Sequence, residues 1–232
     1  MSRSTSVNRG DDVQHEMLEQ DFFEHDFSGE DLQGLLFRRC RFVRCSFNRA
    51  DLTDCHFEQC QFVEPGDLLG CDFSYATLIN AKFSDCRLNL ARFTGARCFG
   101  AEFRDSNLQG ADFYRASFTN QIGINHYFCS AVISGCNLAY GNLSQVIVEE
   151  CELTDNRWRG ANLTGASLRG SNLSGGEFSP ELWGEFDLRG ANLTRVDLEG
   201  LDPREVALEG VMIDAWQQSQ LLAPFGLIVC GE

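Results

Sequence analysis

Large apolar residues recur at every fifth position along most of this chain, a period that matches neither a strand nor an α-helix. One series runs from Phe22 to Phe62, and a second series, shifted by one residue, runs from Leu68 to Phe118. The second series resumes in the same phase at Phe128 and continues to Ile213. A short fixed period of this kind predicts a solenoid, in which each repeat packs only against its neighbours.

A small residue stands two positions before most of the large ones, so each five-residue unit offers one large and one small side chain to an interior. The position between them is commonly Asp or Asn, and the two positions after the large residue favour Ser, Thr, Arg or Gly, as in residues 160–164. Those residue types suit turns and water. We therefore expect substitutions at inward positions to be costly and substitutions at outward positions to be cheap. The small inward positions include Cys40, Cys45, Ala50, Cys55, Cys60, Cys71, Ala76, Ala81, Cys86, Ala91, Ala96, Ala101, Ser106, Ala111, Ala116, Ala161, Ala166 and Ser171.

The pattern resembles the A(D/N)LXX repeat of the pentapeptide-repeat family from about Phe22 to Ile213. This resemblance implies an all-β fold, a right-handed quadrilateral parallel β-helix with one pentapeptide on each side and about 20 residues in each turn. A narrow interior filled by alternating large and small side chains agrees with it. Nine to ten coils at roughly 4.8 Å per layer would make a rod about 45 Å long.

Three regions are expected from this pattern. Residues 1–20 are acidic and poor in apolar residues, so we predict a disordered extension. Residues 21–213 form the β-helix, interrupted by loops at 63–70 and 119–130. Residues 214–232 form a C-terminal helix and a dimerisation tail.

The C-terminal segment carries a helix signal followed by an uncovered apolar tail. Asp214 is placed as an N-cap with Gln217 three residues later, which predicts a helix over 215–222 that stops before Pro224. The apolar residues exceed what one short helix can hide, so a homodimer through this end is expected, with a self-capped monomer as the alternative. The predicted interface is Trp216, Leu221, Leu222, Phe225, Leu227, Ile228 and Val229.

The repeat breaks twice, and loops on a rigid scaffold often carry recognition. Both breaks place apolar side chains where no coil covers them, which favours partner binding over a tolerated insertion. Loop A is Val63, Glu64, Pro65, Gly66, Asp67, Leu68, Leu69 and Gly70. Loop B is Thr119, Asn120, Gln121, Ile122, Gly123, Ile124, Asn125, His126 and Tyr127, and it extends to residue 130.

The two loops, together with residues 128–131, 151–158, 174–179 and 216–229, resemble the Qnr quinolone-resistance branch of the family. The resemblance implies a cytoplasmic homodimer that binds DNA gyrase and topoisomerase IV and protects them from quinolones, with a rod that mimics DNA and with both loops needed. Two alternatives stay open. One is a DNA-mimicking gyrase inhibitor that does not relieve the drug, and the other is a structural or interaction module without catalysis.

The net charge of −15 argues against direct binding to nucleic acid, because phosphate contacts require Lys and Arg. The charge is uneven. Residues 32–128 sum to +1 and residues 129–232 sum to −9, so an acidic surface is expected mostly on the C-terminal half.

The cysteine and histidine residues do not show the spacing of a catalytic or metal-binding site. Eight of the eleven cysteines fall on small inward positions, where a thiol packs as a compact apolar group, and the four histidines share no ligand spacing. We expect no catalytic residue, metal, cofactor or small-molecule substrate. No apolar run of about 20 residues and no secretory signal is present, which predicts a cytoplasmic protein that does not cross a membrane.

Overall fold

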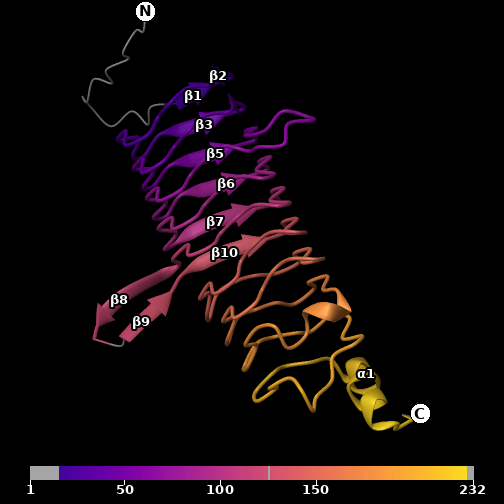
Figure 1. The fold of residues 1–232 in the computed structure, drawn as a ribbon. Coiled ribbons are helices and arrows are strands. Elements are labelled where there is room, and N and C mark those ends of the chain that lie inside the picture. The colour runs from indigo at the N-terminus through magenta and orange to yellow at the C-terminus, as the bar shows by residue number, and fades with distance from the viewer. Residues whose placement is uncertain (1–15, 125, 229–232) are drawn as a thin grey trace, which may run out of the picture.

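The computed structural model describes residues 16–124 and 126–228, which form a four-sided rod of stacked coils (Figure 1). Each coil pairs in parallel with the next. In an uninterrupted coil the partner lies 20 residues further on, as for Phe37 and Phe57. The predicted β-helix solenoid is confirmed.

Short strands define one side of the rod, where β1, β3, β5, β6, β7 and β10 form a six-stranded parallel sheet. β2 and β4 pair on a second side, and isolated parallel bridges such as Asp112 with Asn142 hold other coils together. The strand bounds are β1 Glu16–Leu18, β2 Asp21–Phe23, β3 Leu36–Arg38, β4 Arg41–Val43, β5 His56–Glu58, β6 Lys82–Ser84, β7 Ala101–Arg104, β8 Thr119–Gly123, β9 His126–Cys129 and β10 Ala131–Ser134.

Columns of stacked phenylalanine rings fill the N-terminal half of the rod. Phe73, Phe93 and Phe113 belong to one column, with neighbouring ring centroids 5.0 and 4.6 Å apart and nearly parallel planes. Neighbouring columns meet edge to face, as for Phe103 and Phe113. Burying each ring contributes roughly 1.5 to 3 kcal/mol, and favourable ring geometry adds to it. The layered core is therefore the main source of stability.

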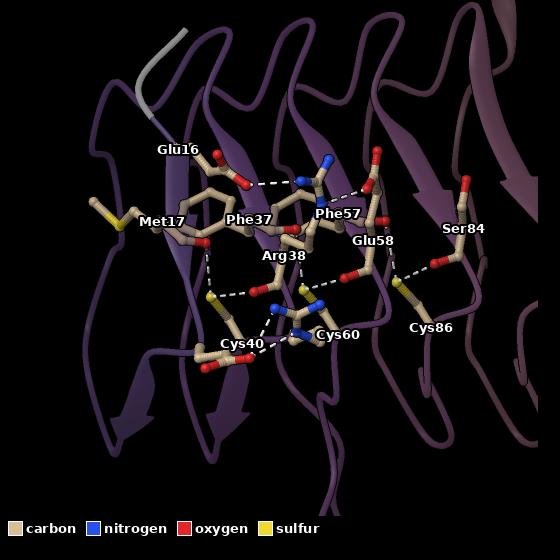
Figure 2. A network of polar contacts seen from close by, with 12 residues as sticks. Glu16, Met17, Phe37, Arg38, Cys40, Phe57, Glu58, Cys60, Ser84 and Cys86 are labelled. Atoms are coloured by element: carbon tan, nitrogen blue, oxygen red, sulfur yellow. Dashed lines mark hydrogen bonds and ion pairs between the residues drawn. The ribbon is translucent and has the colours of Figure 1, made fainter.

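Cysteines at the small positions bond to the coil before them (Figure 2). The thiols of Cys40 and Cys60 donate to the carbonyl oxygens of Met17 and Phe37 at 3.2 and 3.3 Å, and Cys86 repeats the arrangement one coil later. Outside this column, Arg38 lies between Glu16 and Glu58. These thiols lie in the core, as the repeat predicts.

The solenoid begins earlier than expected, since β1 starts at Glu16 and pairs with β3. The expectation of disorder is therefore wrong for residues 16–20, and residues 1–15 lie outside the described part. The physical reason is visible in the period. Met17 stands five residues before Phe22 and packs against the core, so it supplies one more inward side chain.

Two residues assigned to the inward series are exposed. Leu68 and Phe128 have exposed fractions of 87% and 45%, because each belongs to a segment that has left the rod. A side chain on a projecting segment cannot reach the interior, whatever its phase in the sequence.

The C-terminal end is helical over a longer span than predicted. A 3-10 turn, Ala215–Gln217, leads into α1, Gln218–Leu222, and a further 3-10 turn, Ala223–Phe225, carries the chain past Pro224. Proline is tolerated there because the first turn of a helix needs no N–H from it. Gly226 then ends the segment in the left-handed conformation, with φ at 73°. Another 3-10 turn, Pro180–Leu182, interrupts a late coil and turns Leu182 inward.

Candidate partner-binding surface

Loop A leaves the rod after Phe62 and returns at Cys71, whose N–H donates to the carbonyl oxygen of Phe62 at 3.2 Å. Ser46 pairs with Asp72 rather than with a residue 20 positions on, so the loop adds six residues to its coil. The loop therefore projects from a closed base, and the ladder of coils continues beneath it.

Ion pairs hold loop A against the preceding coil. Arg41 contacts Glu64 at 2.9 Å, and Arg44 contacts Asp67 at 3.1 Å. At the other end, a Cβ on Gly70 would lie 2.5 Å from the carbonyl oxygen of Asn89, so only glycine permits this approach. Between these anchors, Leu68 and Leu69 stand in solvent.

A groove of about 700 Å³ runs beside loop A. Val63 to Asp67 form one wall, and Leu90 and Tyr140 add apolar surface from later coils. Arg87 also lines it. The loop thus joins a continuous surface that spans several coils.

Loop B is a β-hairpin that extends away from the rod (Figure 1). β8 and β9 pair antiparallel, with Thr119 opposite Cys129 and an irregularity in register between Gln121 and Gly123. Asp112 pairs with Asn142, 30 residues on, so this insertion adds ten residues to its coil. Ile122 and Ile124 are 69% and 89% exposed near the tip, while Asn125 lies outside the described residues.

Residues from neighbouring coils support the base of loop B. The Tyr127 hydroxyl donates to Glu149 at 3.1 Å, and burial together with this carboxylate raises the pKa of Tyr127. Phe128 meets Phe99 edge to face at 5.1 Å. Phe99 and Glu149 were not among the predicted site residues. The sequence signal for Phe99 was an aromatic residue at an outward position one coil before loop B. Its contact with Phe128, however, depends on how the coils stack.

The two loops lie on opposite sides of the rod, several coils apart (Figure 1). The structure does not bring them together into one cluster. A partner that contacts both must therefore extend around the rod or along it.

The last coil is capped by the chain's own helix. Asp214 and Gln217 form the predicted capping box, and the Gln217 side chain is fully buried. Its amide donates to the carbonyl oxygens of Leu193 and Val196 at 2.8 and 2.6 Å. Leu221 packs against the core below.

Apolar surface remains outside this cap. Among the residues predicted for the dimer interface, Leu221 and Leu222 are half-buried within the chain, and Val229 lies outside the described part. The exposed fractions of Trp216, Phe225, Leu227 and Ile228 are 55%, 50%, 56% and 89%. The end of the rod thus carries an uncovered patch made by four of the seven predicted residues.

Acidic residues dominate the surface of the C-terminal half. Residues 131–213 hold thirteen Asp and Glu against six Arg. Several of these arginines are paired with acids of the same or a nearby coil, as in Arg195 with Asp155 and Arg157 with Glu177. The surface available to a partner is therefore mainly carboxylate.

The described residues offer no alternative site of the kind that binds a metal, since they contain no group of three or more His, Cys, Asp or Glu that could hold one. Across residues 16–124 and 126–228, every helix falls short of the length and apolar character that crossing a bilayer requires.

Two family models match the chain. A model described as a pentapeptide repeat region matches residues 30–113, and a model of pentapeptide repeats in eight copies matches residues 149–179.

Known proteins resemble the chain in sequence and in structure. The pentapeptide repeat protein VPA0095 of Vibrio parahaemolyticus is 50% identical over 142 residues, and QnrB4 of Escherichia coli is 44% identical over 108 residues. These alignments cover 61% and 47% of this chain and 66% and 50% of the relatives, so the chain spans about half to two thirds of the curated relatives it matches. The structure of full-length QnrB1, a plasmid-mediated fluoroquinolone resistance protein, superposes with a TM-score of 0.84 at 39% identity, over 91% of this chain and 100% of that one.

Proposed function

Because the chain belongs to the pentapeptide-repeat family, in its Qnr branch, we propose that it binds the bacterial type II topoisomerases, DNA gyrase and topoisomerase IV, in the cytoplasm and protects them from quinolones. Two of the similar proteins, QnrB96 of Scandinavium goeteborgense and QnrB1, are named as quinolone or fluoroquinolone resistance proteins. The activity proposed here is binding without catalysis.

The observation that carries this proposal is loop B. A rod alone suffices to occupy a DNA-binding surface, but a hairpin with Ile122 and Ile124 in solvent gains burial only against a partner. Its base is fixed by Tyr127 on Glu149 and by Phe128 on Phe99, so the tip is presented in a defined direction. Contacts made by such a hairpin could destabilise a drug-bound complex of enzyme and DNA.

The charge on the rod supports mimicry of DNA. Residues 131–213 sum to −7 and make about four coils of roughly 4.8 Å each, or about one net negative charge per 3 Å. B-DNA carries one per roughly 1.7 Å. The C-terminal half therefore approaches the charge density of a duplex within a factor of about two, which suits the basic saddle of a topoisomerase.

Pairing through the C-terminal end extends this surface. A homodimer that covers Trp216, Phe225, Leu227 and Ile228 would set two acidic halves side by side and give a rod of roughly 90 to 100 Å. The self-capping of the last coil by Gln217 leaves these four side chains available for a second copy.

A supercoiling assay tests the proposal. Purified protein is titrated into a gyrase reaction with relaxed plasmid, with and without ciprofloxacin. We expect little inhibition without the drug and recovery of supercoiling in its presence. Inhibition in both reactions would instead indicate a DNA mimic that only competes, and no effect in either would indicate an interaction module with another partner.

A further inference from the structure

Two tyrosines at corners of the rod have the same surroundings on one side. Tyr75 and Tyr140 both occupy the left-handed turn position, with φ at 59° and 60°. One coil later each is followed by a glycine, Gly95 or Gly160. A Cβ on either glycine would lie only 2.7 to 2.9 Å from two carbons of the tyrosine ring. Each glycine therefore makes room for the ring that packs on it.

The surroundings differ on the other side, which faces the preceding coil. Before Tyr75 the equivalent residue is Arg49, whose guanidinium lies over the ring at 5.8 Å from its centroid. Before Tyr140 it is Gly110, and the Leu90 side chain packs over that glycine. The coil before Tyr140 therefore supplies no side chain to the position that Arg49 fills above Tyr75.

This side of Tyr140 faces the groove beside loop A. Tyr140 is 61% exposed and lines the groove together with Gly110 and Gln109. A cation is attracted to the electron-rich face of a tyrosine. The side-chain amide of Gln109 has no partner among the described residues, so its carbonyl oxygen can accept N–H groups. The groove thus offers a flat ring face and a hydrogen-bond acceptor beside it.

The ion pairs that hold loop A leave an excess of negative charge at this groove. Each of two arginines is shared between an acid of the loop and an acid of the first coil. The pairs are Arg41 with Glu64 and Asp21, and Arg44 with Asp67 and Glu24. The four acids exceed the two arginines by two charges, of which Arg87 on the groove lining offsets one. A cationic occupant therefore fits the groove better than an anionic one.

We propose that the groove binds an arginine side chain of the partner protein, whose guanidinium lies over Tyr140 as that of Arg49 lies over Tyr75. A guanidinium fits better than an ammonium, because it is planar and weakly hydrated and keeps its N–H donors at its edge while its face covers a ring. The apolar stem of the arginine packs on Leu90. Where the partner is a type II topoisomerase, this inference rests on the function proposed above.

The first test needs no topoisomerase. The chain has four tyrosines, so protein labelled with ¹³C in its tyrosine rings gives few NMR signals, and Tyr140→Phe assigns those of Tyr140. N-acetyl-argininamide is titrated into the full chain at constant ionic strength. We expect the signals of Tyr140 to shift and to saturate. Those of Tyr75 should stay in place, because Arg49 already covers that ring.

Three results of this titration would overturn the proposal. The first is an equal shift of Tyr75 and Tyr140, or no shift of either. The second is an equal response to N-acetyl-leucinamide, which would show that the groove takes an apolar side chain. The third is a stronger response to N-acetyl-lysinamide than to the arginine probe.

The second test measures binding of the full chain to gyrase by surface plasmon resonance. Tyr140→Ala should weaken binding roughly 2- to 30-fold, as expected for the loss of one cation–π contact, whereas Tyr140→Phe keeps the ring and should bind like the wild-type chain. Tyr75→Ala is the matched control and should bind like wild type, since the face of that ring is already filled. Melting curves check that the variants fold.

Unchanged binding of Tyr140→Ala would overturn the contact with gyrase. Failure of the wild-type chain to bind gyrase would instead count against the proposed function, and the titration with N-acetyl-argininamide would then decide the groove by itself.

Discussion

Asp112 shows that an outward residue of the repeat contributes more than solubility. Its carboxylate accepts hydrogen bonds from the Tyr114 N–H in its own turn, from the Thr94 hydroxyl of one neighbouring coil and from the Asn142 amide of the other. Each such bond contributes roughly 0.5 to 1.5 kcal/mol. We therefore expect replacement of the Asp and Asn residues that join coils to cost more than replacement of other outward residues, and the low cost of outward substitutions stays a prediction.

Replacement of a central ring tests the inward assignment. Phe113 is fully buried and stacks on Phe93 at 4.6 Å, so Phe113→Ala should lower the free energy of unfolding by roughly 3 to 5 kcal/mol through a cavity that stacked coils cannot close. Denaturant unfolding measures the change. The control is Gln109→Ala, an exposed position in the turn before, which should stay within about 0.5 kcal/mol. Equal stabilities of the two variants would contradict the assignment.

Buried thiols predict a loss of stability at high pH. Burial raises the pKa of Cys55 to about 12 and that of Cys136 to about 11, from an ordinary value near 9. Above pH 9 the unfolded chain loses these protons and the folded chain keeps them, so unfolding becomes easier as pH rises towards 11. Each thiol contributes a slope of about 1.4 kcal/mol per pH unit.

The double variant Cys55→Ala, Cys136→Ala isolates this effect. Alanine fills the same small position in other coils, such as Ala76 and Ala91, so the substitution is expected to be tolerated at neutral pH. Urea unfolding at pH 8, 9.5 and 10.5 should show a shallower decline for the variant than for the wild-type chain. Parallel declines would mean that other groups govern the alkaline limit.

The strands of the coils depend on neighbouring coils for their hydrogen bonds, but the two loops depend on them less. Coil strands of three or four residues exist only because parallel neighbours complete their hydrogen bonds, whereas β8 and β9 pair mainly with each other. Loop A lacks strands and depends on Arg41, Arg44 and the close approach at Gly70. Changes in the loops should therefore leave the coils intact.

Deletion of residues 121–126 tests the role of loop B. Asn120 pairs with Phe128 across the hairpin, so Tyr127 is its diagonal neighbour, and the shortened chain should fold with a melting temperature within a few degrees of wild type. We expect loss of gyrase protection, since Ile122 and Ile124 are removed, and a smaller loss when 64–69 is deleted. Full rescue of gyrase by the 121–126 deletion would sink the proposed role of this loop.

At the scale of the whole molecule, two properties run along the rod in parallel. The phenylalanine columns end near Phe118, where leucine and isoleucine take over the core, and net negative charge accumulates beyond the same point. Loop B marks the boundary. The N-terminal half thus has the stacked aromatic core, and the C-terminal half has the acidic surface and the uncovered end.

The apolar patch at the C-terminal end of the rod leads to a prediction of the oligomeric state. We expect a dimer at micromolar concentration by light scattering, and we expect Leu227→Ser with Ile228→Ser to give a monomer of unchanged melting temperature, since both side chains lie outside the cap. Truncation after Ile213 is a poorer test because it also removes Gln217 from the last coil. A monomeric mass for the wild-type chain would refute the dimer.

The sequence alone predicted a solenoid with alternating large and small inward side chains, because its five-residue period fits neither a strand nor an α-helix. The four-sided form of the coil was implied by the resemblance of that repeat to the pentapeptide-repeat family. The sequence also located the two breaks, since any insertion into so regular a pattern shifts or interrupts the phase. The inward cysteines and the helix signal at Asp214 and Gln217 were readable for the same reason, as each depends only on residues close in sequence.

Tertiary structure alone decided what the breaks became and what holds them. Loop B was marked in the sequence only as an absence of repeat, and its hairpin depends on pairing across a turn and on Phe99 and Glu149 from other coils. The phase of the pattern placed Leu68 and Phe128 inside, but a residue is buried only if its segment stays on the rod.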